Sequence, residues 1–407
     1  LHTAYRRQRQ MCIRDSYQTY EIKEQADKQI KVNSSYNDYI ENEFYKISLD
    51  NNGNIIVDGD SNINKIYLEN NGDEGDSYDY STPDDDLFIS AGNISDVRIK
   101  KMAMHQNLSY CLTRRVPKNL EDRSKKLLNE ELKSKASITL YKNKKYIEIK
   151  YKTNNNIIEH RDRIIIDTKI KAQKSIADQA FGSILREVDY SKYNNWKEEG
   201  WNDKPRGIQP MISFAALDSK QTVCAVSDGV REYEVLDNNK LAFTMFRSVP
   251  YLGKPDLNDR PSRASGVHKV QMGHALLGTE VETTIYVSDL ENNYYDMHAY
   301  SKEVLNKLIS YQAGEIYDNT DYFVISKNGS YPREYSMLEV EGAIMSSLKL
   351  AELDDNLILR VYNPYRNKDI SFTISHKEIK YLKADELSKD DAKNIIKPCG
   401  IKTLKLI

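Results

Sequence analysis

The chain of 407 residues has little cysteine and no closely spaced cysteine pair. Because no CxxC spacing occurs, the sequence excludes a disulfide framework and a thiolate zinc site. Scattered thiols are typical of a reducing compartment, so we expect a cytoplasmic protein. The four cysteines are Cys12, Cys111, Cys224 and Cys399.

Long apolar runs and an excess of positive charge are also missing. No apolar run approaches the roughly 20 residues that span a bilayer, and no signal peptide is visible, so we expect no membrane partner. Lysine and arginine number 59 against 61 aspartates and glutamates, which gives a net charge of −2. Because phosphate binding needs a basic excess, we do not expect nucleic acid as a partner.

Motifs of self-contained catalytic centres are absent as well. No GxSxG, P-loop, GxGxxG or HxxxH pattern occurs, and the histidines are dispersed. The run from Asp58 to Glu69 is similar to a calcium-binding EF-hand loop, but Ile63 stands where that loop needs glycine. We therefore predict neither a metal site nor a catalytic residue within this chain.

The chain does contain a series of short alternating segments separated by turn residues, which is typical of antiparallel β structure. The clearest is a hairpin of residues 44–49 and 54–57, with Asp50 to Gly53 as its turn. No β-α-β alternation is visible. Tyrosine is abundant, with 29 residues against 2 tryptophans, and it suits both strands and sugar-facing surfaces.

Three segments depart from this pattern. Residues 119–135 have helix-forming composition but few apolar residues, so they form either a helix or a solvated excursion between strands. Residues 300–310 predict a short amphipathic helix. Residues 175–203 show little regular pattern and hold both tryptophans, and long loops of this kind usually carry function or cover another part of the fold.

The strand pattern predicts a mainly β protein with a large sandwich over residues 39–335 and a smaller one over 336–407. We interpret residues 17–38 as the last strand of an upstream domain followed by a linker. Residues 1–16 are basic, match nothing else in the chain and resemble translated sequencing-adapter read-through. We expect them to be non-native, the alternative being a basic arm that binds nucleic acid or membrane.

Two polar runs, far apart in the sequence, are the candidate functional segments. The acidic run Gly72 to Asp86 holds Tyr78 and Tyr80, which in an extended segment face the same side and could form a sugar-contacting wall. The run Arg247 to Gly266 is rich in arginine, whose planar donor fork suits carboxylates, phosphates and vicinal hydroxyls. Packing of the tyrosines and ion pairing of the arginines are the alternatives. We expect both runs to line one carbohydrate-facing surface.

Seven collinear stretches give the sequence a family resemblance. They are Glu41 to Leu49, Gly72 to Pro83, Asn154 to Arg163, Ala177 to Arg186, Gly229 to Val235, Leu241 to Ser248 and Asp259 to Gly266. With them the chain resembles the C-terminal half of family 38 glycoside hydrolases, the retaining α-mannosidases. It looks closest to the bacterial branch that includes mannosylglycerate hydrolases.

The resemblance implies a galactose-mutarotase-like antiparallel supersandwich followed by a smaller β-sandwich. It also implies that the zinc ligands, the aspartate nucleophile and the acid/base belong to an upstream catalytic domain, which is the expected partner of this region. The intact enzyme is then expected to hydrolyse α-mannosides, with mannosylglycerate or its phosphorylated form as candidate substrates and zinc as cofactor. The fragment alone is expected to be inactive.

The resemblance also implies site residues, because the family's C-terminal β region contributes a tyrosine and an arginine to the substrate pocket. By position, the implied substrate-binding residues are Tyr78, with Tyr80 as second choice, and Arg263, with Arg260 as second choice. Asp76 is implied to orient the tyrosine or a sugar hydroxyl.

Two rival functions stay open at this point. A stand-alone carbohydrate-binding β-sandwich would bind sugar without a catalytic domain. A mutarotase-like epimerase would need His160 close to Glu159 or Glu232 for proton transfer. The sequence also leaves open the substrate linkage and whether the chain forms a homo-oligomer.

Overall fold

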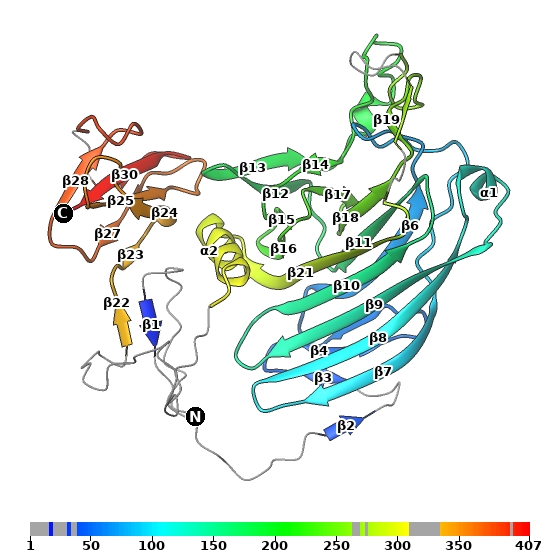
Figure 1. The fold of residues 1–407 in the computed structure, drawn as a ribbon, viewed down its shortest axis with the longest axis horizontal. Helices are drawn as coiled ribbons and strands as arrows, with labels where there is room; N and C mark the ends of the chain where they lie inside the picture. Colours follow the sequence, from blue (N-terminus) through cyan, green and yellow to red (C-terminus); the bar gives the residue numbers. More distant parts are fainter. Residues whose placement is uncertain are drawn as a thin grey trace, which may run out of the picture. The chain divides into compact units, whose positions relative to one another are not determined.

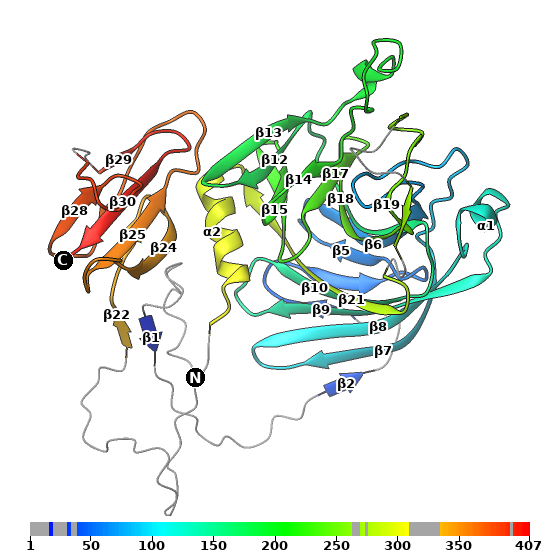
Figure 2. The ribbon, with the colours of Figure 1, turned by 45° about the horizontal axis from the view of Figure 1, so that its top comes forward.

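The computed structural model describes residues 16–18, 31–33, 39–262, 269–272, 276–308, 334–390 and 394–407. The chain divides into a large unit, Lys28–Met297, and a small unit, Leu1–Asp27 with His298–Ile407. Both units consist mainly of antiparallel strands (Figures 1 and 2), which confirms the predicted fold class. The predicted start of the small sandwich at residue 336 stays a prediction, because residues 309–333 lie outside the described residues.

The first sheet of the large unit has ten strands among the described residues, in the order β13-β12-β15-β16-β21-β10-β9-β8-β7-β2. In chain order they are β2 (Lys31–Asn33), β7 (Asn93–Lys101), β8 (His105–Val116), β9 (Glu130–Tyr141), β10 (Ile147–Asn155), β12 (Lys174–Gln179), β13 (Gly182–Glu187), β15 (Phe214–Leu217), β16 (Gln221–Ser227) and β21 (Thr279–Glu291).

The second sheet has eight strands among the described residues, in the order β14-β17-β18-β11-β6-β5-β4-β3. They are β3 (Ile40–Glu41), β4 (Lys46–Leu49), β5 (Ile55–Asp58), β6 (Ile63–Gly72), β11 (His160–Thr168), β14 (Gln209–Pro210), β17 (Glu232–Leu236) and β18 (Lys240–Ser248). The predicted hairpin is confirmed as β4 and β5, and Gly53 in its turn has φ +81°, a conformation that favours glycine.

Both sheets contribute to one hydrophobic core. Ile147, Ile149 and Tyr151 of β10 are fully buried, and Ile164 and Ile166 of β11 belong to the same cluster. Burying one such side chain stabilises the fold by about 1.5–3 kcal/mol. Because side chains alternate along a strand, a slip of one residue would turn each set away from the core, so the apolar pattern fixes the register.

Strand β11 determines where the two polar runs meet. It pairs with β6 on one side and β18 on the other, and His160 at its start lies opposite both Gly72 and Ser248. Since both neighbours are antiparallel to β11, they end at the same edge of the sheet. The acidic loop (residues 72–86) and the arginine loop (residues 249–262) therefore leave the sheet side by side, as expected for two runs on one surface. That this surface faces carbohydrate stays a prediction.

All three irregular segments differ in part from expectation. Only Leu120–Ser124 of residues 119–135 is helical (α1), and Glu130 onward joins β9, because Leu132, Ser134 and Ala136 alternate into the interior. Residues 175–203 were expected to show little regular pattern, but Lys174–Gln179 and Gly182–Glu187 form the hairpin β12–β13. The second helix, α2 (Tyr294–Leu305), begins six residues before the predicted residue 300.

The small unit has its own core, which includes Val340, Leu359, Val361, Phe372 and Leu404. Its largest sheet has the order β24-β25-β30-β28, and three two-stranded pairs, β1-β22, β23-β27 and β26-β29, accompany it among the described residues. The strands are β1 (Ser16–Gln18), β22 (Glu334–Ser336), β23 (Val340–Glu341), β24 (Ile344–Leu350), β25 (Leu357–Tyr362), β26 (Ile370–Ser371), β27 (Thr373–Ile374), β28 (Ile379–Leu382), β29 (Ile395–Ile396) and β30 (Ile401–Leu406).

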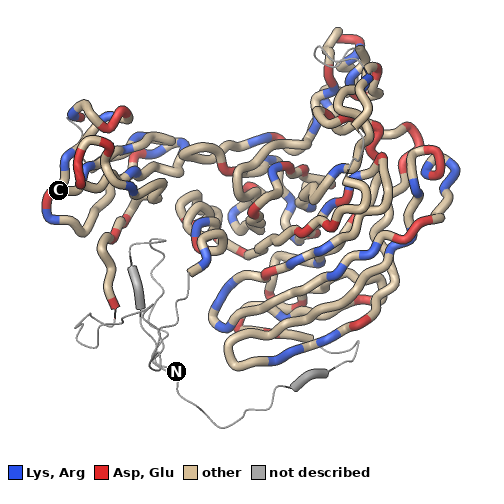
Figure 3. The backbone as a smooth tube through the Cα atoms, in the orientation of Figure 1, with Lys and Arg blue, Asp and Glu red and all other residues tan. Residues whose placement is uncertain are grey.

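Charged residues of both signs are spread over the large unit (Figure 3). The sequence of the acidic loop holds seven acids within residues 72–86. None of the helices that the structure describes is long and apolar enough to cross a membrane.

Candidate functional site

The acidic loop is held at its base by an arginine from the neighbouring strand. Arg247 of β18 donates from Nε to Asp73 Oδ2 at 2.6 Å and from Nη2 to Asp73 Oδ1 at 3.1 Å. The same Nη2 reaches the carbonyl oxygens of Asp76 and Asp79 at 2.8 and 2.7 Å. The Arg247 guanidinium thus connects Asp73 at the start of the loop with the backbone of Asp76 and Asp79. Gly75 makes this possible, because a Cβ there would lie 2.0 Å from the carbonyl oxygen of Asp79.

Asp76, predicted as a positioning residue, is fully buried and shapes the tip of this loop. Its Oδ1 accepts hydrogen bonds from the N–H groups of Tyr78 and Asp79, both at 3.0 Å. Its Oδ2 accepts from the N–H of Lys254 at 2.9 Å. Burial alone raises the pKa of Asp76, but these N–H groups and the Arg260 guanidinium lower it below its usual value.

Arg260 of the arginine loop completes the contact between the two loops. Its Nη2 donates to Asp76 Oδ2 at 2.5 Å and its Nη1 to Asp79 Oδ2 at 2.7 Å. The ion pairing that was the alternative for the arginines is therefore found for Arg247 and Arg260. In this arrangement Arg260 and Asp76 hold the loop in place, and their contact with a substrate stays a prediction.

The two candidate tyrosines lie in different environments. Tyr78 is 55% exposed at the loop tip, whereas Tyr80 is only 6% exposed. The Tyr80 ring packs on the Arg161 guanidinium at 3.6 Å, and its hydroxyl accepts a hydrogen bond from Asn71. The prediction that both rings face the same side is wrong, because the segment is not extended but turns around the Asp76 carboxylate. Tyr80 is not accessible to a sugar in this conformation.

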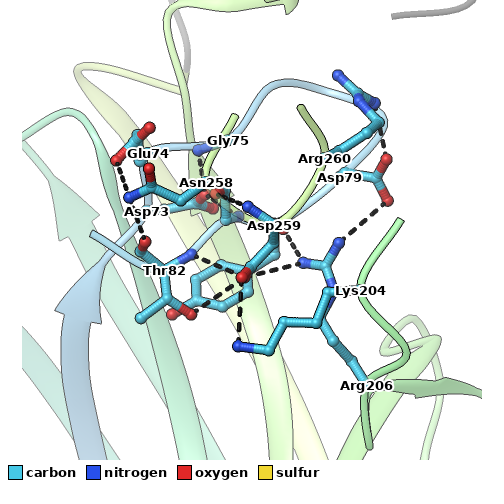
Figure 4. A network of polar contacts seen from close by, with 12 residues as sticks. Asp73, Glu74, Gly75, Asp79, Thr82, Lys204, Arg206, Asn258, Asp259 and Arg260 are labelled. Carbon is cyan, nitrogen blue, oxygen red and sulfur yellow. Dashed lines mark hydrogen bonds and ion pairs between the residues drawn. The ribbon is translucent and has the colours of Figure 1, made fainter. Parts of the chain in front are cut away.

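A third segment, residues 204–206, joins the two loops, and Figure 4 shows this network. The N–H of Lys204 donates to the carbonyl oxygen of Asp259 at 2.9 Å, and its Nζ lies 3.3 Å from Asp259 Oδ1. Arg206 donates to the carbonyl oxygen of Tyr80 and lies 3.8 Å from carboxylate oxygens of Asp79 and Asp259. Three segments from distant parts of the chain are therefore connected at one edge of the sheet.

Sequence reasoning found part of this constellation. Tyr78, Asp76 and Arg260 lie in one network, whereas Arg263 lies outside the described residues. Lys204 and Arg206 were missed because they follow the segment that showed no regular pattern. Asp259 and Arg161 lay within stretches of the family resemblance, which was the available signal for them.

His160 is buried beneath this edge and is not a reactive group. It is 1% exposed, its Nδ1 accepts from Asn70 Nδ2 at 2.7 Å, and its Nε2 donates to Asn155 Oδ1 at 2.9 Å. Burial, with nearby Arg123 and Arg114, lowers its pKa to about 3. The epimerase alternative needed His160 to exchange protons with a sugar, and this burial contradicts it.

The buried histidines predict acid sensitivity. The folded pKa of His160, and that of the buried His298 of the small unit, is about 3 against an ordinary value of 6.5. Between these values the unfolded chain binds a proton that the folded chain does not, so stability falls as the pH falls. Within this window, each buried histidine should lower the free energy of unfolding by about 1.4 kcal/mol for every unit by which the pH falls. Urea unfolding at pH 7 and pH 5 measures the loss.

A His160→Leu variant separates this effect from general acid unfolding. It should be less stable at pH 7, because Asn70 and Asn155 lose their partner, yet lose less stability than the unmodified chain on going to pH 5. Equal losses in the two proteins would assign the acid sensitivity to other groups.

The carboxylates of the site are engaged in ion pairs and hydrogen bonds, which suits positioning better than acid/base chemistry. Among the residues that the structure describes, no group of three or more His, Cys, Asp and Glu side chains could hold a metal ion. Zinc, which the resemblance implies for the intact enzyme, does not fit this part of the chain. No chemical step is therefore assigned to a metal here.

The small unit carries a pocket of 780 Å³ lined in part by Leu353, Leu387 and Ile358. Two of its carboxylates are already paired, Asp354 with Lys405 and Glu386 with Arg360. The pocket contains none of the predicted site residues, so the loops of the large unit remain the better candidate.

Residues 40–257 match the family described as "Glycosyl hydrolases family 38 C-terminal domain". No curated protein sequence matches the chain significantly.

Two solved structures from Enterococcus faecalis are similar to the chain. An alpha-mannosidase from strain V583 aligns with a TM-score of 0.70 at 16% identity, over 93% of this chain and 43% of its own. A protein in glycosyl hydrolase family 38 aligns with a TM-score of 0.69 at 16% identity, over 93% of this chain and 45% of its own. The chain thus shares their fold over less than half of their length.

Proposed function

This chain belongs to glycosyl hydrolase family 38, as its sequence resemblance predicted, and we propose that it is the carbohydrate-positioning β region of an α-mannosidase. The observation that carries the proposal is the contrast within the acidic loop. The Asp73 and Asp76 carboxylates of this loop are paired with Arg247 and Arg260, while Tyr78 is exposed at the tip. A rigid loop that presents one amphipathic ring suits the positioning of a sugar.

In this proposal the intact protein hydrolyses α-mannosides with retention. That reaction needs a carboxylate nucleophile and an acid/base about 5–5.5 Å apart, and another region of the intact protein supplies both, together with the zinc ligands. Arg263 would contact the sugar or an anionic aglycone, since a guanidinium suits glycerate or phosphate. Mannosylglycerate and its phosphorylated form are therefore candidate substrates. Of the cysteines, the structure describes Cys111, Cys224 and Cys399, and all three are free thiols, which supports a cytoplasmic location.

Tyr78→Phe is expected to lower kcat/KM for an α-mannoside about tenfold in the intact protein, because a sugar loses one hydrogen bond, and Tyr78→Ala more. Steady-state kinetics measure the change. Phe88→Ala is the matched control, since Phe88 is 58% exposed on the same connection but lies outside the network. Equal kinetics of Tyr78→Ala and Phe88→Ala would remove Tyr78 from the site.

The rival function, a stand-alone carbohydrate-binding module, makes a different prediction. Calorimetric titration of this chain with mannose would then show binding comparable to that of the intact protein. Binding that needs the intact protein favours the hydrolase.

A further inference from the structure

Both tryptophans of the chain lie in one aromatic lobe (residues 189–203), which follows β13. Figures 1 and 2 show this green segment projecting beyond the two sheets of the large unit. Trp196 is buried and forms the inside of the lobe. Trp201 is 46% exposed.

The exposed ring has a fixed neighbour. The centroids of Tyr193 and Trp201 are 5.7 Å apart with their planes tilted by 45°, and Tyr190 lies 5.9 Å from Tyr193. Two backbone hydrogen bonds fix the positions of Tyr193 and Trp201. The N–H of Trp201 donates to the carbonyl oxygen of Trp196, and the N–H of Trp196 donates to the carbonyl oxygen of Tyr193. The lobe thus presents two amphipathic rings on a defined backbone.

The lobe is also connected to the candidate site. Immediately after it, Lys204 pairs with Asp259 and Arg206 with Asp79, the residues that hold the acidic and arginine loops. The lobe is therefore joined to the loop network through the residues that follow it. This continuity argues that the lobe and the loop tip serve the same ligand.

We propose that Tyr193 and Trp201 form an outer sugar subsite, which binds a pyranose ring of the substrate other than the one that Tyr78 contacts. The apolar face of a pyranose packs against aromatic rings, while its hydroxyl groups stay in water or reach nearby polar groups. This inference rests on the proposed function and refines it. It favours mannosides with a second sugar ring over mannosylglycerate, which has one.

Tryptophan fluorescence tests the subsite without any need for catalysis. In the intact protein, the part of the iodide quenching that Trp201→Phe removes reports on Trp201, whereas Trp196 is buried and contributes little. α-Mannotriose should protect Trp201 saturably and at lower concentration than mannose. In calorimetry, Trp201→Ala should lower the affinity for α-mannotriose about 2- to 10-fold, whereas Trp201→Phe keeps a ring and should lose less.

Kinetics of the intact protein provide the second measurement. Trp201→Ala should raise KM for α-mannotriose about 2- to 10-fold more than KM for α-mannosyl fluoride, which has a single ring. Phe88→Ala should leave both unchanged.

The proposal is overturned if α-mannotriose neither protects Trp201 nor shows a selective rise in KM in the Trp201→Ala variant. That result leaves the Tyr78 kinetics unaffected, so the proposed function stands. If instead the Tyr78 variants keep full activity while Trp201 is protected, the proposed function fails and the sugar subsite stands.

Discussion

Asp162→Ala is expected to lower the free energy of unfolding of this chain by about 3–5 kcal/mol, the usual cost of leaving one buried charge without its partner. Arg114 of β8 and Asp162 of β11 form a two-point ion pair with N–O distances of 2.8 and 2.7 Å, and neither side chain is exposed to solvent. The strands belong to different sheets, so the pair connects them through the core. Urea unfolding at pH 7 measures the loss.

Two further variants test the reason for this loss. Glu282→Ala breaks the ion pair of Lys152 with Glu282, which lies on the surface of the same unit, and should leave stability within experimental error. The double variant Arg114→Met with Asp162→Leu removes both charges and should recover much of the stability lost in the single variant. A double variant as unstable as Asp162→Ala would show that packing volume, not the unpaired charge, causes the loss.

Gly75→Ala is expected to disorganise the acidic loop and to lower kcat/KM of the intact protein about 100-fold, a typical cost of misplacing a binding group by about 1 Å. The added methyl group would lie 2.0 Å from the carbonyl oxygen of Asp79 and 2.8 Å from Arg247 Nη2. Neither can move without breaking the hydrogen bonds that close the loop. Steady-state kinetics and limited proteolysis of the loop measure the effect.

Gly207→Ala is the matched control for this prediction. Gly207 lies close to the same network, but the nearest atom to an added Cβ is 3.6 Å away, an ordinary contact distance. This variant should keep both the activity and the proteolysis pattern. If Gly75→Ala behaves in the same way, the conformation of the acidic loop does not determine the function of the site.

The strands were predictable because their apolar periodicity is strong. Residues 145–153 alternate with period two, and β10 has this alternation in its burial. Residues 119–135 were harder, because Glu131, Lys133 and Lys135, which are helix-favouring residue types, form the solvent-facing side of the start of β9. Tertiary pairing with β8 and β10 overrides local propensity there.

The candidate site was predictable in its parts but not in its contacts. The acidic and arginine runs stood out by composition, and their proximity follows from the register of β11. The sequence could not show that Asp76 would bend the chain between Tyr78 and Tyr80, because this turn depends on a long-range contact with Lys254 and Arg260. The sequence also did not indicate that Arg206 contacts the acidic loop, because this contact depends on where the chain returns from the aromatic lobe to the sheet.

The position of β11 between β6 and β18 has a consequence for the order of folding. Asp73 and Arg247 lie 174 positions apart in the chain, and Asn70 and His160 lie 90 apart. Contacts between such distant positions carry a large loop-closure entropy and form slowly. Local hairpins such as β4–β5 can form early, whereas the two loops meet only after both long segments have closed on β11. The surface proposed for recognition is therefore among the last parts of the large unit to form.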